Sequence, residues 1–226
     1  MPTEIEAKYI VPDRESFRAL RALTQIAGYA LAPGGKVKVV DRYLDTRGRA
    51  LTRQGWACRL RAVDKTWVVT LKGPRSVHGA VMSREELEIT LAEPTTRPTH
   101  WPEGPLRDRV ERLTGGSALR ELLTIRQKRY RSLAQREGAP VVEIALDVVR
   151  VDGDGASSVS RMVECELLAE GVAADLERLD EALRGEYGLI PEPRTKLQRA
   201  LEFVETGLSP DDALLAGRAG AAAPEP

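Results

Sequence analysis

Acidic and basic residues alternate with apolar ones along several short segments of this chain. Near the N-terminus, Glu4, Glu6 and Lys8 are separated by single apolar residues. Because successive side chains of a strand point to opposite faces, these three residues share one face of a predicted strand. Carboxylates gathered on a face can bind divalent cations, and lysine and arginine can bind phosphate oxygens. Metal-dependent phosphate chemistry is therefore a hypothesis for this chain.

The same alternation recurs in further segments, where charged or polar residues again stand at every second position. The sets are Asp41, Tyr43 and Asp45; Arg59 and Arg61; Thr70 and Lys72; Arg84, Glu86 and Glu88; Glu143, Ala145 and Asp147; and Glu164 and Glu166. The residues between them are mostly apolar, such as Leu60, Leu71 and Ile144.

Two orientations of these strands are open from composition alone. The charged faces can form a solvated exterior, as charged faces usually do, and mixed signs suit a soluble surface. Alternatively, the charged residues line a polar lumen and the apolar residues pack beneath helices. A lumen with both signs is costly unless ions or ligands satisfy its charges. A multiply anionic phosphate chain together with divalent metal ions would meet both needs.

The elements that must position these residues can be predicted from periodicity. Period-two alternation predicts eight strands, over 3–11, 36–45, 56–63, 66–72, 80–91, 123–133, 141–151 and 159–168. Turns are predicted at Asp64-Lys65, Gly138-Ala139-Pro140 and Gly153-Asp154-Gly155. An even number of antiparallel strands closes naturally into a barrel without exposed edges.

Helices interrupt this series of strands. The first is predicted from a cap at Asp13 to about Ala27, before Gly28. Others are predicted within 105–122, over 173–184 and from about Thr195 onward. One β-rich domain with peripheral helices, over 1–208, is the expected organisation. The Ala-, Gly- and Pro-rich segment 209–226 is expected to be a disordered tail or a linker.

Composition limits the class of protein. The 226 residues carry 34 Lys plus Arg and 34 Asp plus Glu, and this zero net charge argues against a general nucleic-acid binder. Two cysteines imply no disulfide framework, and Cys58 and Cys165 alternate with charged residues, which predicts that both face the packed side. No apolar run is long enough for a membrane helix, and the charged start resembles no signal segment. A cytoplasmic location is expected.

Motifs in this order resemble a known family. The run Glu4-Ile5-Glu6-Ala7-Lys8 resembles the E-x-E-x-K signature of the CYTH superfamily, also called triphosphate tunnel metalloenzymes. The motifs that follow in family order are Arg59-Leu60-Arg61, Thr70-Leu71-Lys72-Gly73, Arg84-Glu85-Glu86-Leu87-Glu88, Arg129 before Tyr130, Asp147, the pair Glu164 and Glu166, and Thr195-Lys196-Leu197. The resemblance covers about residues 3 to 205.

The resemblance implies a fold and an activity. The implied fold is α+β and mainly β: a closed eight-stranded antiparallel β-barrel, the triphosphate tunnel, with peripheral helices. The implied activity is metal-dependent hydrolysis of inorganic triphosphate or of an organic triphosphate, such as thiamine or nucleoside triphosphate. The cofactor would be Mg²⁺ or Mn²⁺. The expected partner is a small-molecule triphosphate, with no nucleic acid and no membrane, for a monomer or a homodimer.

Two alternatives remain open at this point. A class IV adenylyl cyclase, which the same family contains, would make cyclic AMP from ATP, but no sequence feature clearly builds a pocket for adenine and ribose. A non-catalytic module that binds polyphosphate or nucleotides is the third possibility. The hydrolase is favoured because the smallest substrate accounts for all the inward charges.

Carried onto this sequence, the resemblance assigns roles to individual residues. Expected metal ligands are Glu4, Glu6, Glu88, Asp147, Glu164 and Glu166. Expected substrate-binding residues are Lys8, Arg59, Arg61, Lys72, Arg84, Arg129 and Lys196. Expected catalytic residues are Glu4, Glu6, Lys8 and Lys196. The plainer alternatives are surface carboxylates and, for Lys196, an ordinary helix residue.

One position departs from the family pattern. The family often has a lysine two residues before the sixth-strand arginine, and here that place holds Gln127, between Arg126 and Lys128. We favour Arg129 as the residue that faces the tunnel, with Gln127 on the same face. Substituting Glu4 or Glu6 by alanine is expected to abolish turnover and to leave the fold intact, because carboxylate repulsion would fall.

Overall fold

The computed structural model describes residues 3–63, 66–78, 81–153 and 156–212. By internal contacts the chain forms two compact units. Unit 1 comprises Met1–Ile5 and Lys38–Gln127, and unit 2 comprises Glu6–Val37 and Lys128–Pro226. Charged residues of the predicted site occur in both units.

The strands form one mainly antiparallel sheet. They are β1 (Thr3–Ile10), β2 (Gln25–Ile26), β3 (Tyr29–Asp45), β4 (Ala57–Val63), β5 (Thr66–His78), β6 (Val81–Leu91), β7 (Arg120–Arg136), β8 (Ala139–Gly153), β9 (Ala156–Leu167) and β10 (Ile190–Pro191). Hydrogen-bonded neighbours run from β1 through β6, β5, β4, β3, β7, β8 and β9, and β9 pairs with β1 again. The predicted fold class, a mainly β sheet closed through eight strands with peripheral helices, is confirmed.

The helices lie between these strands in the sequence. They are α1 (Arg14–Ala22), α2 (Ala50–Arg53), the 3-10 turn η1 (Pro98–His100), α3 (Pro105–Thr114), α4 (Ala173–Gly185) and α5 (Lys196–Thr206). Asp13 caps α1 as predicted, by accepting a hydrogen bond from the Ser16 N–H at 2.7 Å. Thr195 caps α5 in the same way through the Gln198 N–H.

The prediction for the end of α1 was wrong. The helix stops at Ala22, and the following residues form the short hairpin of β2 and β3, in which Ile26 pairs with Tyr29. Both turn residues, Ala27 and Gly28, have positive φ angles of 51° and 83°. Two such residues in succession are typical of a type I′ hairpin turn. The helical spacing of apolar residues therefore continued past the helix into a turn.

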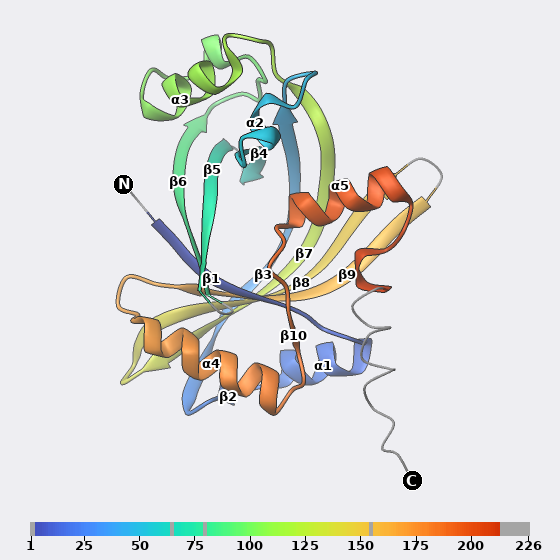
Figure 1. Ribbon diagram of the computed structural model, residues 1–226. Helices are drawn as coiled ribbons and strands as arrows, with labels where there is room; N and C mark the ends of the chain where they lie inside the picture. Colours follow the sequence, from blue (N-terminus) through green and yellow to red (C-terminus); the bar gives the residue numbers. More distant parts are fainter. Residues whose placement is uncertain (1–2, 64–65, 79–80, 154–155, 213–226) are drawn as a thin grey trace. The chain divides into compact units, whose positions relative to one another are not determined.

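In unit 1, the apolar residues of β4 and β5 face the helices. Cys58, Leu60, Val69 and Leu71 are buried in one apolar cluster, which α2 and α3 help to form through residues such as Leu51, Leu106 and Val110. Figure 1 shows α2 and α3 close to this part of the sheet. The charged residues of β4 and β5 alternate with this packed set and so point to the other face.

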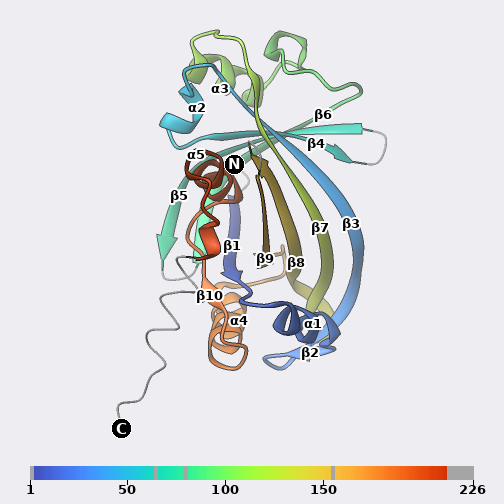
Figure 2. The ribbon, with the colours of Figure 1, turned by 90° about the vertical axis from the view of Figure 1, so that its right-hand side faces the viewer.

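In unit 2, helices cover both faces of the sheet. Strands β8 and β9 run side by side as a long antiparallel pair (Figure 2). Figure 1 shows α1 and α4 on one side of them and α5 on the other. The Tyr9 hydroxyl donates to Asp180 on α4 at 2.8 Å, and the Tyr29 hydroxyl donates to Asp175 at 2.8 Å. These bonds attach α4 to the apolar face, whereas α5 lies over the charged one.

Some predicted features fall outside the described residues. These are the turn at Asp64-Lys65, the centre of the turn at Asp154-Gly155 and the part of the tail over 213–226. The turn at Gly138 is present, with positive φ at Glu137 and Gly138. Among the helices that the structure describes, none has both the length and the apolar character that crossing a membrane would require.

Candidate active site

The first charged cluster, in unit 1, surrounds the Glu4 carboxylate. Lys72 donates to Oε1 of Glu4 at 2.7 Å, and Arg84 donates through Nε to Oε2 at 2.6 Å. Lys72 also donates to Glu86 at 3.0 Å. Burial by itself would raise the pKa of Glu4, but the charges of Lys72 and Arg84 outweigh it and lower that pKa to about 2. Glu4 is therefore an ionised and tightly bound carboxylate.

A second row of polar side chains crosses unit 1 through Arg59. In the strand register, Arg59 lies opposite both Tyr43 and Thr70, and Thr70 lies opposite Glu88. The Nη2 group of Arg59 donates to the Thr70 hydroxyl at 2.9 Å. The Thr70 hydroxyl in turn donates to Glu88 at 2.7 Å. The Glu88 side chain is 52% exposed, against 13% for Arg59. Arg59 is thus shielded and oriented, whereas Glu88 lies where solvent reaches it.

Beside this row, Arg61 is bound to a buried carboxylate. Its Nε and Nη2 groups donate to the two oxygens of Asp41 at 2.5 and 2.8 Å. The Nε2 group of Gln127 donates to the same carboxylate at 2.5 Å. Asp41 is fully buried. Gln127, the neutral residue at the position where the family often has a lysine, therefore contacts Asp41 of unit 1.

In unit 2, two cations and two carboxylates form a compact cluster. The Arg129 guanidinium donates to both oxygens of Asp147, at 2.9 and 2.7 Å, and to Glu164 at 2.5 Å. Lys196 donates to Asp147 at 2.6 Å and to Glu164 at 2.8 Å. Burial opposes ionisation of Glu164, but Lys196, Arg129 and Lys8 hold its pKa well below the usual range. These four residues, all predicted for the site, are brought together.

Lys8 lies next to this cluster on β1. It pairs with Glu164 in the β1–β9 register, and its Nζ lies 3.9 Å from Oε1 of that residue. The same ammonium donates to Glu6 at 2.5 Å. The Glu192 N–H donates to the Lys8 carbonyl at 2.8 Å, which fixes the backbone of β1 at this residue. The side chains of Lys8 and Glu6 are both buried.

Three carboxylates stand in register across neighbouring strands of unit 2. Glu6 pairs with Glu166 between β1 and β9, and Glu166 pairs with Glu143 between β9 and β8. Directly opposed like charges repel, and a divalent cation would offset that repulsion. Carboxylates are also the ligands that Mg²⁺ and Mn²⁺ prefer. The residue types therefore fit such an ion.

The carboxylates are nevertheless held by lysine and arginine. Within the described ranges, no three histidine, cysteine or carboxylate groups are arranged so that they could hold a metal ion as they stand. Glu166, an expected ligand, is exposed, whereas Asp147 and Glu6 are buried. Coordination would require carboxylates to exchange ammonium or guanidinium partners for the ion.

Both cysteines lie on the packed side, as predicted. Cys58 and Cys165 are buried and free. Burial raises the pKa of Cys58 to about 12 and raises that of Cys165 as well. Neither thiol is a reactive nucleophile at neutral pH, because the thiolate is the reactive form.

Several polar residues of these clusters were absent from the set predicted from the sequence. They are Asp41, Thr70, Glu86, Gln127 and Glu143 as side chains of the clusters, and Glu192 as a support of β1. The period-two pattern placed most of them on a charged face. Which cation each would meet depends on the pairing register, which a single sequence does not reveal.

A ring-ordered antiparallel sheet, with ion-paired carboxylates and cations on one face and apolar residues on the other, defines the fold class. The family model for the CYTH domain matches residues 2–201. The chain therefore belongs to the CYTH family.

Solved structures of other proteins share this fold. A Hippeastrum protein, proposed as an adenylyl cyclase and described as having a dominant triphosphatase activity, is 21% identical with a TM-score of 0.67, over 92% of this chain and 98% of that one. A Bacillus halodurans protein, proposed as an adenylate cyclase, is 22% identical with a TM-score of 0.62, over 88% and 98%. The PH1819 protein of Pyrococcus horikoshii is 21% identical with a TM-score of 0.56, over 87% and 98%. Among curated protein sequences, no match was found.

Proposed function

We propose that this chain is a metal-dependent triphosphatase that hydrolyses inorganic triphosphate or an organic triphosphate, such as thiamine or nucleoside triphosphate. The observation that carries the proposal is the shielded cluster of Arg129, Asp147, Glu164 and Lys196. Charges removed from water are costly, and apolar residues of similar size would often stabilise a fold equally well. A polyanion and its counter-ions would use both signs. The Hippeastrum protein of the same fold has a dominant triphosphatase activity, which agrees with this choice.

The basic side chains would bind the phosphate chain. Arginine can donate two parallel hydrogen bonds to one phosphate, whereas lysine acts as a point charge. Each basic residue of the proposed set already donates to, or lies within 4 Å of, an acidic side chain, so phosphate oxygens would join or replace carboxylate oxygens of similar charge. The set is Lys8, Arg59, Arg61, Lys72, Arg84, Arg129 and Lys196.

The carboxylates released in this exchange would hold Mg²⁺ or Mn²⁺. We assign this role to Glu4, Glu6, Glu88, Asp147, Glu164 and Glu166. When bound, such an ion supplies further neutralisation of phosphate charge and can activate water. The low pKa values of Glu4 and Glu164 keep both groups ionised at neutral pH, as metal ligands must be.

The chemical step would depend mainly on charge neutralisation and positioning. Phosphoryl transfer needs little covalent chemistry from a protein. Lys8 and Lys196 present ammonium groups, which would stabilise charge on phosphate oxygens as a phosphate leaves. Asp147 and Glu164 hold the Lys196 ammonium at a defined place before substrate binds. Glu4, Glu6, Lys8 and Lys196 are the proposed catalytic set.

A substrate panel tests the proposal. The purified protein is incubated with Mg²⁺ or Mn²⁺ and with tripolyphosphate, ATP or thiamine triphosphate, and orthophosphate, pyrophosphate and cyclic AMP are measured. Release of orthophosphate is expected, and a Glu6→Gln variant in the same buffers controls for contaminating phosphatases. Cyclic AMP with pyrophosphate from ATP would instead indicate a cyclase. Tight binding without turnover in any metal would contradict hydrolysis and indicate a binding module.

A further inference from the structure

Strand β3 carries two buried aspartates in unit 1, and they have different kinds of partner. Asp45 accepts hydrogen bonds from the backbone N–H groups of Leu51 and Thr52, both at 2.9 Å, and so holds the start of α2. Asp41 accepts from the side chains of Arg61 and Gln127. The role of Asp45 is therefore structural, whereas Asp41 belongs to the charged face.

The contacts of Asp41 set the plane of a guanidinium group. Two parallel hydrogen bonds, from Nε and Nη2 of Arg61, fix the plane of that group and not only its position. Asp41 itself cannot turn freely, because it is fully buried and also accepts from Gln127. Arg61 is therefore oriented by a carboxylate that is itself held in place.

Two buried polar atoms next to this carboxylate lack hydrogen-bond partners. Nε of Arg59 lies 3.8 Å from Oδ1 of Asp41, too far for a hydrogen bond. Among the side chains that the structure describes, this Nε and the Oε1 of Gln127 are both buried without a partner. Buried polar groups are nearly always satisfied, so unsatisfied ones call for an explanation. A ligand that brings its own acceptors and donors would provide one.

We propose that Asp41 is a positioning residue for substrate binding, which aligns Arg61 directly and Arg59 at longer range for contact with a phosphate group. The proposal rests on the proposed triphosphatase function. Gln127 supports the aspartate with a neutral amide. A lysine at that position would bring a cation that competes with Arg61 for the same carboxylate oxygens.

The proposal predicts that Asp41→Asn weakens the binding of tripolyphosphate. Loss of a negative charge between two arginines would by itself strengthen anion binding. However, the asparagine NH₂ group would face N–H donors of Arg61 or Gln127, so the guanidinium would lose its alignment. If Asp41 positions Arg61, the dissociation constant for tripolyphosphate and the KM rise about tenfold, while kcat changes less, because uniform binding is lost.

The experiment compares Asp41→Asn with the matched variant Asp45→Asn. Calorimetric titration with tripolyphosphate in metal-free buffer gives the dissociation constant without turnover, and steady-state assays with metal give KM and kcat. Asp45→Asn should lower the midpoint of thermal unfolding and leave KM unchanged at a temperature where it is folded. If Asp41→Asn binds tripolyphosphate as tightly as wild type or more tightly, the aspartate only balances charge and the proposal is wrong.

A double-mutant cycle separates positioning from a general loss of structure. If Asp41 acts through Arg61, then Asp41→Asn adds little to the binding defect of Arg61→Gln. Fully additive defects would overturn the proposal. A wild-type protein that binds tripolyphosphate but hydrolyses no triphosphate contradicts the triphosphatase function alone, and the metal-free titration still tests Asp41. If wild type does not bind tripolyphosphate at all, both proposals fail.

Discussion

At the scale of single residues, carboxylates of the candidate site each contact two cationic side chains. Glu4 is held by Lys72 and Arg84, and Asp147 by Arg129 and Lys196. The sequence led to the expectation that alanine in place of Glu4 leaves the fold intact, because repulsion between carboxylates would fall. Removing Glu4 does not simply relieve repulsion between carboxylates, because it leaves two cations next to each other. We therefore expect alanine at this position to lower stability as well as activity.

Glu4 should make the stability of the protein depend on pH in acid. Its pKa is about 2 in the folded state, against 4.5 for the ordinary group. A lowered pKa stabilises the fold fully above pH 4.5, and this contribution is lost as the pH falls toward 2. Glu4→Gln should therefore lower the free energy of unfolding near neutral pH by roughly 3 kcal/mol, at about 1.4 kcal/mol per pKa unit.

Urea unfolding of wild type and Glu4→Gln between pH 2 and 7 checks this expectation. The difference in unfolding free energy should shrink toward pH 2, where the wild-type carboxylate is also becoming neutral. Glu15, an exposed carboxylate in the first turn of α1, provides a control variant, Glu15→Gln. A difference between wild type and Glu4→Gln that stays constant over the whole range would contradict the assigned ion pairs.

Lys196 offers a test of the chemical step. Lys196→Met keeps most of the side-chain volume and removes the ammonium group that donates to Asp147 and Glu164. Loss of one preorganised charge donor at a reacting phosphate should lower kcat about 100-fold. Val204→Ala, an exposed position of the same helix, should leave kcat unchanged. Equal kcat values for Lys196→Met and wild type would remove Lys196 from the catalytic set.

At the scale of elements, alternation predicted the strands, whereas the end of one helix and the presence of a short one were not predicted. All eight predicted strands are present, because each presents one packed face and one charged face, as with Leu60 beside Arg59 and Arg61. The end of α1 and the short α2 were missed. The α1 periodicity ran on into a type I′ turn, and the four-residue α2 is held by the Asp45 carboxylate, which accepts from its N–H groups, and not by an apolar repeat.

For the candidate site, the sequence predicted residue types but not all of their contacts. The residue types at every second position could be read from the sequence, and Glu164 and Lys196, both in the predicted set, lie in one charged cluster. The partners of Asp41 could not, because they come from β4 and β7 and depend on pairing register. Glu166 is exposed although Glu164 on the same face is shielded, a difference that their shared alternation does not predict. The pairing of strands that are distant in the sequence therefore determines contacts that periodicity does not predict.

The N-terminus of α5 links element stability to the site. The Thr195 hydroxyl accepts from the Gln198 N–H at 3.0 Å, and the Gln198 side chain accepts from the Thr195 N–H at 2.9 Å. Loss of such a capping box typically costs about 1 kcal/mol. Thr195→Ala should lower the free energy of unfolding by that amount in urea titrations, whereas Thr195→Ser should retain it. Equal losses in both variants would mean that the methyl group, and not the cap, is important.

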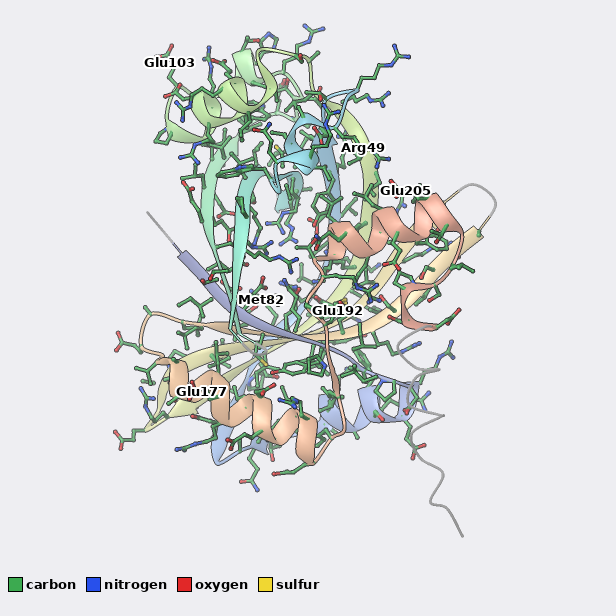
Figure 3. All side chains as sticks on the ribbon, viewed as in Figure 1. Arg49, Met82, Glu103, Glu177, Glu192 and Glu205 are labelled. Carbon is green, nitrogen blue, oxygen red and sulfur yellow. The ribbon has the colours of Figure 1, made fainter. Side chains whose placement is uncertain are left out.

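At the scale of the whole chain, a buried charge network anchors α5. Figure 3 shows Glu192 in the segment that joins β10 to α5. Arg199 on α5 donates to Glu192 and to Asp211, and Arg194 donates to Glu192 at 2.7 Å. Breaking a buried network of this kind is costly, because it leaves charges without partners. The residues after α5 therefore help to hold the helix that carries Lys196.

This network includes residues that follow the expected end of the domain. The expected boundary after Leu208 stays a prediction, but Asp211 is buried against Arg199, and the Pro210 carbonyl accepts from Arg194 at 3.4 Å. These contacts favour a domain that includes Pro210 and Asp211. Two truncated chains, ending at Leu208 and at Asp212, distinguish the two possibilities.

The chain that ends at Leu208 should be less stable than the one that ends at Asp212. Arg199 would keep Glu192 and lose Asp211, at a cost of about 2 kcal/mol for a charged hydrogen bond. For a protein of this size, that corresponds to a fall of roughly 4–8 °C in the midpoint of thermal unfolding. Scanning calorimetry measures it, and Asp211→Asn in the full chain should reproduce most of the loss. Equal midpoints for the two truncated chains would return the boundary to Leu208, and would show that Glu192 alone is enough to anchor Arg199 and α5.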